Sequence, residues 1–397
     1  MFKFLIVLLF QIPCACAADG GSTYSALLDS LAVSGHRYLE TSTIGDTLVI
    51  RYWPVGFRDE YGAFRNIRTV TTQWFALHTD SKIDHVIFIQ EAWGIPLIRS
   101  MLTLSDSSAI DVGRDLLVQR ESVSYASNSF PGILLQFDFP LKANFGEPFD
   151  PLVFRTGIRS DLRVMILPGF LAYGQMEFYV HNEYDPKQWY EPANIGFMYA
   201  RPFSGTTLSV TNIGLFQREL YGIDEEIRTL LFDETISVGF RGGVFGKQRF
   251  RNSRFEYYPL NKWMSILNVA WTWTRYDCTF GVKGGRFLYG DRGVGVEISR
   301  IFKEVEIGLS GVRSGPDVIT YMNFRIPLYP PSRKERASHG IGLVNAFRMS
   351  YRNDSRGLEP RDKPFTRAYE PESGISYREL EGLARVPHFR FMFQEGR

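Results

Sequence analysis

The amino-acid sequence predicts a mainly β protein: a transmembrane antiparallel β-barrel of about 12 to 18 strands, preceded by a small periplasmic α/β domain. Three observations lead to this fold class. The chain begins with an export-type segment, its C-terminal two-thirds alternate apolar and polar residues, and charged residues interrupt every later apolar stretch before it could cross a bilayer as a helix. Since only helices and closed barrels satisfy the backbone inside a membrane, a membrane location requires a barrel.

Residues 1–17 have the pattern of a cleaved signal peptide. A short charged start precedes the apolar run Phe4–Ile12, and Ala15-Cys16-Ala17 offers the small residues that signal peptidase requires. The apolar run falls well short of the roughly 20 residues of a membrane anchor. Pro13 fits badly in a lipoprotein signal ending at Cys16. We therefore expect an exported protein of the Gram-negative outer membrane.

Cysteine usage and net charge exclude two classes of protein. Two of the three cysteines lie in the signal segment, so Cys278 would remain alone and no intramolecular disulfide could form. The 45 Lys and Arg residues nearly balance the 43 Asp and Glu residues. A disulfide-stapled scaffold is excluded, and the net charge indicates no polyanion-binding surface, so no nucleic-acid partner is expected.

The sequence pattern of residues 22–122 predicts the periplasmic α/β domain. A short helix near Ala26–Val33 and a β-branched strand at Thr47–Tyr52 come first. Aromatic and aliphatic residues then recur at spacings of three and four between Phe57 and Trp74. That spacing places one apolar stripe along a helix.

The second half of this domain predicts a hairpin and a further helix. Val86–Ile89 and Ile95–Leu104 have the composition of strands, with Trp93-Gly94 in the turn between them. A closing helix is expected over Ser107–Leu117. A unit of about a hundred residues lies within the size range of an independent domain.

Residues 125–397 predict the barrel, because the apolar pattern there takes a period of two. In Gln175–Val180, for example, polar and apolar residues alternate, and each such run is close to the roughly 9 to 11 residues of a membrane-crossing strand. Comparable runs are centred on Phe137, Val296, Ile307, Phe324 and Met349. The polar, Pro- and Arg-rich tract at 330–373 is expected to form loops or an extension.

A soluble β-sandwich would also alternate, with its polar face toward bulk water. The chemistry of the two faces favours the barrel. The polar faces are rich in Gly, Arg and Glu, and the apolar faces carry aromatic residues near strand ends, such as Trp271, Trp273, Tyr289 and Tyr351. Lipid outside and a wet, charged lumen inside produce this pattern.

Catalytic and metal sites find little support. The six histidines, at positions 36, 78, 85, 181, 339 and 388, have no metal-ligand spacing with one another or with Cys. The segment Gly290–Gly295 superficially looks like a phosphate loop, but a strand follows it instead of a helix, so a tight turn is the better interpretation. We expect no enzyme activity, no metal and no cofactor.

Basic residues on the expected lumen face are the candidate substrate contacts, because lumen charges tune what passes through a barrel. They are Arg241, Lys283, Arg286, Arg325, Arg348 and Arg352. For any one of them the simpler interpretation is a solvated charge paired with Glu297 or Glu306. Their donors would suit the carboxylates of an acidic sugar polymer, on whose rings aromatic side chains can stack.

The stretch Gly284–Phe302 resembles the YjbH-like outer-membrane proteins associated with exopolysaccharide and capsule loci. In that family a G-R-Y-L-x-G-D-x-G turn leads into a strand ending S-R-x-F, as Ser299–Phe302 does here. Gly290, Asp291 and Gly293 match the turn, whereas Arg292 stands where a bulky aromatic residue is common. Shorter matches extend the resemblance over most of the mature chain: Gly45–Ile50, Gly94–Leu97, Tyr199–Phe203 and Glu219–Gly222.

The resemblance implies an outer-membrane barrel that assists export or assembly of a surface exopolysaccharide or capsule, with no active-site residues to transfer. Its partners would be outer-membrane lipid, a polysaccharide, and periplasmic export proteins bound through residues 22–122. Two other classes stay open from the residues themselves. One is a general porin or solute channel, and the other is an outer-membrane enzyme acting on lipid or glycan.

Overall fold

The computed structural model describes residues 24–34, 36–53, 60–78, 82–105, 110–113, 125–127, 133–145, 152–183, 189–216, 219–232, 234–251, 254–302, 305–327, 341–343, 346–354 and 370. The described chain is mainly β, as the sequence predicts, and its strands form two sheets. The signal segment 1–17 and most of the tract 330–373 lie outside the described residues. None of the described helices is both long enough and apolar enough to cross a membrane.

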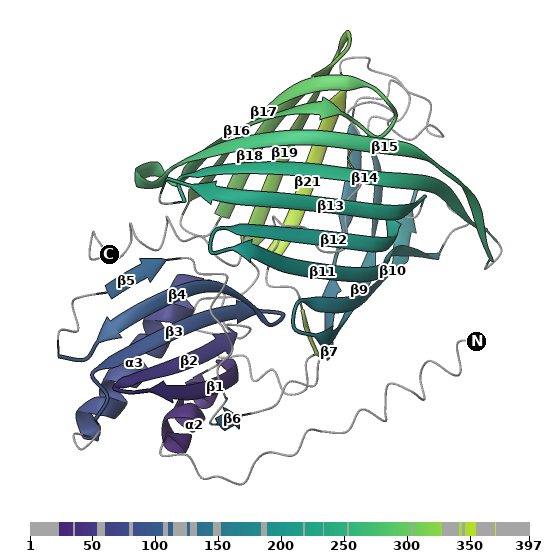
Figure 1. Cartoon of the computed structure of the whole chain (residues 1–397). Helices are drawn as coiled ribbons and strands as arrows, with labels where there is room; N and C mark the ends of the chain where they lie inside the picture. Colours follow the sequence, from purple (N-terminus) through teal and green to yellow (C-terminus); the bar gives the residue numbers. More distant parts are fainter. Residues whose placement is uncertain are drawn as a thin grey trace.

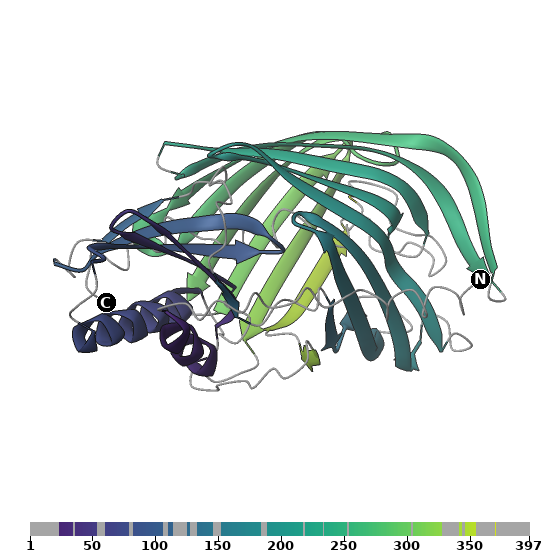
Figure 2. The same ribbon diagram turned by 60° about the horizontal axis from the view of Figure 1, so that its bottom comes forward.

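The first sheet has six strands in the order β5-β4-β3-β2-β1-β6. Their bounds are β1 Arg37–Ile44, β2 Thr47–Trp53, β3 His85–Ala92, β4 Ile95–Thr103, β5 Ile110–Gly113 and β6 Tyr125–Ser127. Only β2 and β3 pair in parallel, because the chain between them crosses over through helix α3 (Glu60–Leu77). Helix α2 (Ser25–Ser34) and α3 lie on the same face of the sheet (Figure 2).

The core of this unit lies between the helices and the sheet. Leu27 and Leu31 of α2, Phe64 and Ile67 of α3, and Phe88 of β3 are all fully or almost fully buried. The Phe64 and Phe88 rings meet edge to face, with centroids 5.7 Å apart. Burying each such side chain contributes roughly 1.5 to 3 kcal/mol, so the apolar stripe of α3 is what attaches the helix to the sheet.

The expected closing helix over Ser107–Leu117 is wrong where the structure describes it. Ile110–Gly113 is strand β5, which pairs antiparallel with β4. Asp111 lies between two apolar residues, which is the period of a strand and not of a helix. The other elements expected in this unit coincide with α2, β2, α3, β3 and β4.

The second sheet contains 15 strands and runs β20-β7-β9, then through consecutive strands to β19 and β21, with β8 also paired to β9. The bounds are β7 Ile133–Asp138, β8 Leu141–Phe145, β9 Leu152–Leu167, β10 Phe170–Asn182, β11 Tyr190–Ser204, β12 Thr207–Phe216, β13 Leu220–Leu231, β14 Ile236–Arg251, β15 Arg254–Trp273, β16 Cys278–Arg286, β17 Arg292–Phe302, β18 Val305–Ser314, β19 Asp317–Pro327, β20 Ile341–Leu343 and β21 Ala346–Asp354. The strand number falls within the expected range. The sheet curves strongly, so that β16 to β19 and β21 pass behind β11 to β15 (Figure 1).

The hydrogen-bonded ladder of this sheet is open. Among the described residues β21 pairs with β19, and no ladder joins β21 to β7 or β8 at the other end. The short strand β20 pairs with β7 in parallel. The described strands therefore form a curved sheet that is not closed into a barrel.

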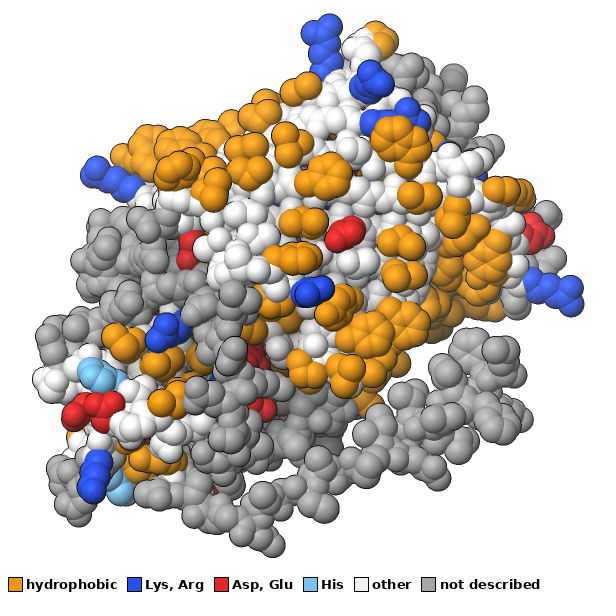
Figure 3. Space-filling view, in the orientation of Figure 1, with side chains coloured by type: hydrophobic (Ala, Val, Ile, Leu, Met, Phe, Trp, Pro, Cys, Tyr) orange, Lys and Arg blue, Asp and Glu red, His pale blue; other side chains and the backbone are white. Residues whose placement is uncertain are grey.

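The two faces of the large sheet have opposite chemistry. We call outer face the one that carries Phe178, Leu267 and Val296, and inner face the one that carries Glu177 and Asp224. Phe178 is 48% exposed, whereas Glu177, its neighbour in the chain, is 2% exposed. Hydrophobic side chains are spread across the outer face that is in view, with acidic and basic groups near its middle and further basic groups toward its margins (Figure 3). This is the alternation that the sequence predicts, with the charges on the buried side.

Exposed aromatic residues lie at two heights along the strands of the outer face. Along β15, Trp263 lies near one level and Trp271 and Trp273 near the other, and all three are exposed. The roughly ten residue steps from Trp263 to Trp273 cover about 33 Å of strand. In a closed barrel with a strand tilt of about 40°, this length would span roughly 25 Å, which is the height of the apolar band of outer-membrane barrels.

Glu225 is an exception on the outer face. Its side chain is exposed, and its carboxylate accepts a hydrogen bond of 3.1 Å from the Ser209 hydroxyl of the neighbouring strand. From β14 to β19 the middle of the outer face is apolar, and the basic residues Arg286, Arg292 and Arg300 lie near the strand ends.

The turn between β3 and β4 joins the two sheets. Trp93 and Gly94 both have positive φ angles, 56° and 74°, which produces the tight two-residue hairpin that the sequence predicts there. The Trp93 carbonyl accepts a 2.9 Å hydrogen bond from the Gly169 N–H, in the turn between β9 and β10. The Arg163 guanidinium of the inner face lies 5.9 Å from the Trp93 ring centroid. The hairpin thus contacts one end of the large sheet.

Candidate functional site: the charged inner face

Arg241 and Asp224 form the centre of an ionic network on the inner face. Arg241 Nε donates to Asp224 Oδ1 at 3.0 Å, and Arg241 Nη2 donates to Oδ2 at 2.8 Å. This bidentate geometry is the strong form of an arginine–carboxylate pair. Asp224 is 2% exposed, so its buried charge is compensated chiefly by Arg241.

Glu370 extends this network from a distant part of the chain. Its Oε1 lies 2.5 Å from Lys283 Nζ, and its Oε2 lies 3.6 Å from Arg241 Nη1. Glu370 belongs to the tract expected to form loops or an extension, yet its carboxylate bridges two cations on strands β14 and β16. The inner face therefore binds a carboxylate, here one supplied by the same chain.

A second network lines strands β9 to β11. Arg163 Nη2 donates to Asp161 Oδ2 at 2.7 Å, and the same oxygen accepts from Gln175 Nε2 at 3.1 Å. Gln175 in turn accepts from Asn194 Nδ2 at 2.8 Å. Two residues along from the Asp161 and Gln175 pair, Arg159 pairs with Glu177 at 2.7 Å. Buried polar groups linked in this way hold one another in fixed positions.

An apolar cluster covers the inner face near the turn between β16 and β17. Its fully or almost fully buried members are Phe216, Leu220, Phe245, Met264, Ile266, Phe287, Leu288, Val312 and Ile319. The cluster draws residues from strands on opposite sides of the curved sheet, since β12 contributes Phe216 and β19 contributes Ile319. These side chains pack across the interior at that end.

The residues that match the YjbH-like turn lie beside this cluster. Gly290 has a φ of +94°, which favours glycine, and its N–H donates to the Phe287 carbonyl at 3.0 Å. Asp291 Oδ2 accepts a 2.5 Å hydrogen bond from the Ser314 hydroxyl. At Gly293 an added Cβ would lie 2.4 Å from the Arg313 carbonyl oxygen. The segment is a tight turn, as expected, and its glycines are required by the backbone.

The six basic residues predicted to line the lumen do not all lie together in the structure. Arg241 and Lys283 lie on the inner face and share Glu370. Arg325 pairs in register with Glu306, between the outward-facing neighbours Phe324 and Ile326. The backbones of Arg348 and Arg352 lie in β21, but their side chains are outside the described part of the chain.

The expectation for Arg286 is wrong, because its side chain lies on the outer face. It stacks on the exposed Trp263 ring, 4.1 Å from the ring centroid. Lys283 and Arg286 are three positions apart in one strand, and side chains in a strand alternate. They therefore lie on opposite faces of the sheet, and only Lys283 lies on the inner face.

Histidines do not form a site among the described residues. No group of three His, Cys, Asp or Glu there could hold a metal ion. His36 is fully buried in the first unit, and burial lowers its pKa to about 4, so it is neutral at pH 7. Its ring packs edge-on against Tyr52 and bonds Asn66, which makes it a core residue. His339 and His388 lie outside the described residues.

Comparison with known proteins yields no matching family model and no matching curated protein. The resemblance to YjbH-like proteins therefore rests on the residues of this chain, chiefly Gly284–Phe302. The chemistry of the inner and outer faces is the other basis for assigning a function.

Proposed function

We propose that this protein is an outer-membrane β-barrel that assists export or assembly of a surface exopolysaccharide or capsule. The observation that carries the membrane location is the inverted distribution of polarity in the large sheet. Bulky apolar side chains are exposed on the outer face, while carboxylates and guanidinium groups are buried on the inner face. In water such an apolar surface is unfavourable, whereas in lipid it is the favourable arrangement.

Closure of the sheet is part of this proposal. Inside a bilayer each unpaired backbone group at an open edge costs several kcal/mol, so edge strands are not tolerated there. Among the described strands, the free edges belong to β21 on one side and to β20 and β8 on the other. We expect these edges to pair when the chain is in a membrane.

The orientation follows from the two ends of the sheet. The α/β unit contacts the turn at Gly169, on the end where the β9–β10, β11–β12 and β13–β14 connections lie. This end faces the periplasm in the proposal, where export proteins could bind residues 22–122. The opposite end carries the long ribbon of β14 and β15 and faces outward.

The inner face supports a role with an acidic glycan. Arg241 and Lys283 already hold a carboxylate, that of Glu370, and uronic acids or similar sugars present the same group. A general porin has less support, because these charges are engaged with one another and an apolar cluster packs across one end. Assistance in assembly or export fits an occupied interior better than free solute passage does.

The proposed function is tested by measuring the surface polysaccharide of mutant strains. Deleting the gene should abolish or alter the surface polysaccharide when the export cluster is expressed, and Arg→Gln at Arg325, Arg348 and Arg352 together should reduce it. Arg300→Gln, on the outer face, is the control and should leave the polymer unchanged. Heat-modifiable gel migration checks that every variant assembles. A deletion strain with normal polysaccharide would contradict the proposal and favour the porin.

A further inference from the structure

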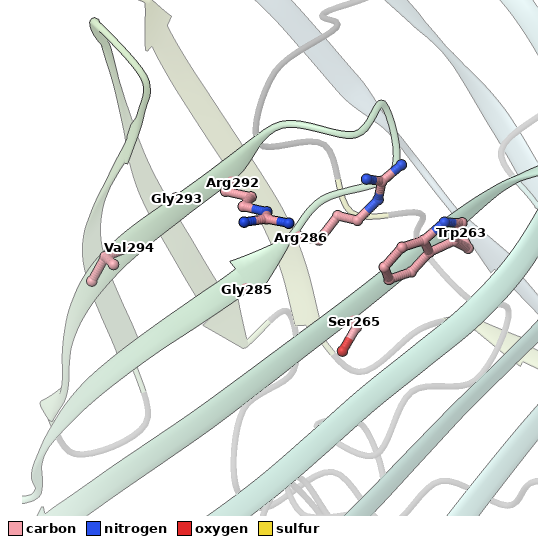
Figure 4. Close-up of a pocket in the computed structure, with 7 residues that line it drawn as sticks. All are labelled: Trp263, Ser265, Gly285, Arg286, Arg292, Gly293 and Val294. Carbon is pink, nitrogen blue, oxygen red and sulfur yellow. The ribbon is translucent and has the colours of Figure 1, made fainter.

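A shallow recess on the outer face lies where strands β15, β16 and β17 run side by side. Its volume is about 550 Å³, and it is lined by Trp263, Ser265, Gly285, Arg286, Arg292, Gly293 and Val294. Arg286 lies beside Trp263, and Arg292 extends from the adjacent strand on the other side of Arg286 (Figure 4). Glycines at positions 285 and 293 contribute no side chains, so the floor of the recess is backbone.

Two like charges oppose each other directly in this recess. Arg286 and Arg292 are register partners across the β16–β17 ladder. Like charges at such a position destabilise a sheet. Arg313 is also exposed on this face, opposite Val294, and adds a third positive charge. Among the described residues no carboxylate forms an ion pair with any of these three arginines, so within that part of the chain the positive charge of the recess has no ionic partner.

The guanidinium group of Arg286 is held in a position where it can bind a ligand. Its stacking on Trp263 holds the planar group against the ring. Its Nε is buried and has no hydrogen-bond partner among the described residues. A guanidinium offers paired donors that match phosphate oxygens, and a phosphate between Arg286 and Arg292 would remove their repulsion.

The surroundings of the recess are apolar on one side. Val294 is 61% exposed, and Val296 and Val282 continue the exposed apolar surface toward the middle of the outer face. A small soluble anion would not use this surface. An amphipathic molecule would place its phosphate at the arginines and its hydrocarbon chains along the valines.

We propose that this recess binds the phosphate group of a lipid in the outer leaflet of the membrane. The inference rests on the proposed function, which places Trp263 at the outward membrane–water boundary. Aromatic and basic side chains are favourable at such boundaries, where phosphates are found. The site would attach the barrel to the phosphorylated lipid around it, on the side opposite the α/β unit.

The test compares two lipids on the full-length protein in nonionic detergent. The probes are bisphosphorylated lipid A and the same glycolipid after enzymatic removal of its phosphates, with binding followed by native mass spectrometry. We expect the phosphorylated lipid to bind at least about tenfold more tightly, because a hydrogen bond to a charged group is worth more than the roughly 1.4 kcal/mol that equals a factor of ten. Arg286→Gln with Arg292→Gln should abolish this preference.

Arg300→Gln is the matched control. Arg300 is also exposed on the outer face of β17 and lies 4.6 Å over the Phe302 ring, but at the opposite strand end. It should keep the tenfold preference. Equal loss in this control, or equal binding of both lipids by the wild type, would overturn the inference.

Further outcomes distinguish a failure of this inference from a failure of the proposed membrane location. Inorganic phosphate alone should not displace the lipid; displacement at millimolar phosphate would assign the recess to a soluble anion and overturn the lipid proposal. If the wild type binds neither lipid and stays soluble without detergent, the membrane location itself fails and the inference fails with it. If it inserts into detergent or bilayer yet does not distinguish the lipids, only this inference fails.

Discussion

Leu267→Arg should lower the free energy of unfolding by roughly 2 to 4 kcal/mol if the outer face contacts lipid, which is the cost of an arginine at the bilayer midplane of a barrel. Leu267 is 54% exposed and lies midway between Trp263 and Trp271 on the outward side of β15. In a water-exposed sheet the same substitution would change stability by only about 0.5 kcal/mol. Urea titration of the protein refolded into vesicles measures the difference.

Leu260→Arg is the matched control for this substitution. Leu260 is 51% exposed on the same strand, but it lies beyond Trp263 in the part of β15 that pairs only with β14. It should therefore remain outside the apolar band and cost little. Equal effects of the two substitutions would contradict a lipid-facing outer surface, whether both were small or both large.

Asp224→Asn should destabilise the protein by about 3 to 5 kcal/mol, because it removes one partner of a buried ion pair. Arg241 would lose its bidentate carboxylate and keep the longer contact of 3.6 Å to Glu370. Denaturant unfolding of the refolded protein provides the measurement. The loss should exceed that of any conservative substitution on the outer face.

Glu225→Gln is the matched control for Asp224→Asn, because it also neutralises a carboxylate but at an exposed position. Glu225 follows Asp224 in the chain, but its side chain is on the opposite face and exposed. Its substitution should not destabilise the protein, because it removes a charge from a face that contacts lipid in the proposal, where charges are unfavourable. A cost for Glu225→Gln as large as that for Asp224→Asn would contradict the assignment of the two faces.

The period-two pattern was sufficient to predict the mainly β fold and the face on which most side chains lie. In β10, the polar residues Gln175 and Glu177 are buried and Phe178 is exposed, as the alternation predicts. The hairpin at Trp93-Gly94 was also predictable, because a tight turn between two apolar runs is a local feature. The predicted closure into a barrel is not seen among the described strands, and a periodic pattern cannot predict it because closure depends on pairing between distant strands.

The candidate site was predicted less completely, for reasons that differ from residue to residue. Asp224 is the first of three consecutive acidic residues, Asp224, Glu225 and Glu226. The sequence alone does not indicate which of their side chains points inward. Glu370 belongs to a polar tract with no periodicity, and only the folded chain brings it to Lys283. The predicted inner-face position of Arg286 is wrong, because Arg286 lies three positions after Lys283 in strand β16 and therefore on the opposite face.

Nitroxide labels on β15 test the central claim, that the outer face of the large sheet contacts lipid. Labels would be placed by cysteine substitution at Leu267 and Asn268, with Cys278 replaced by serine, and the protein reconstituted in vesicles. The proposal predicts that label 267 is accessible to oxygen and shielded from a water-soluble nickel chelate, and that label 268, facing the interior, is less accessible to oxygen. Label 267 as accessible to the nickel chelate as a label at the control position Leu260 would contradict it.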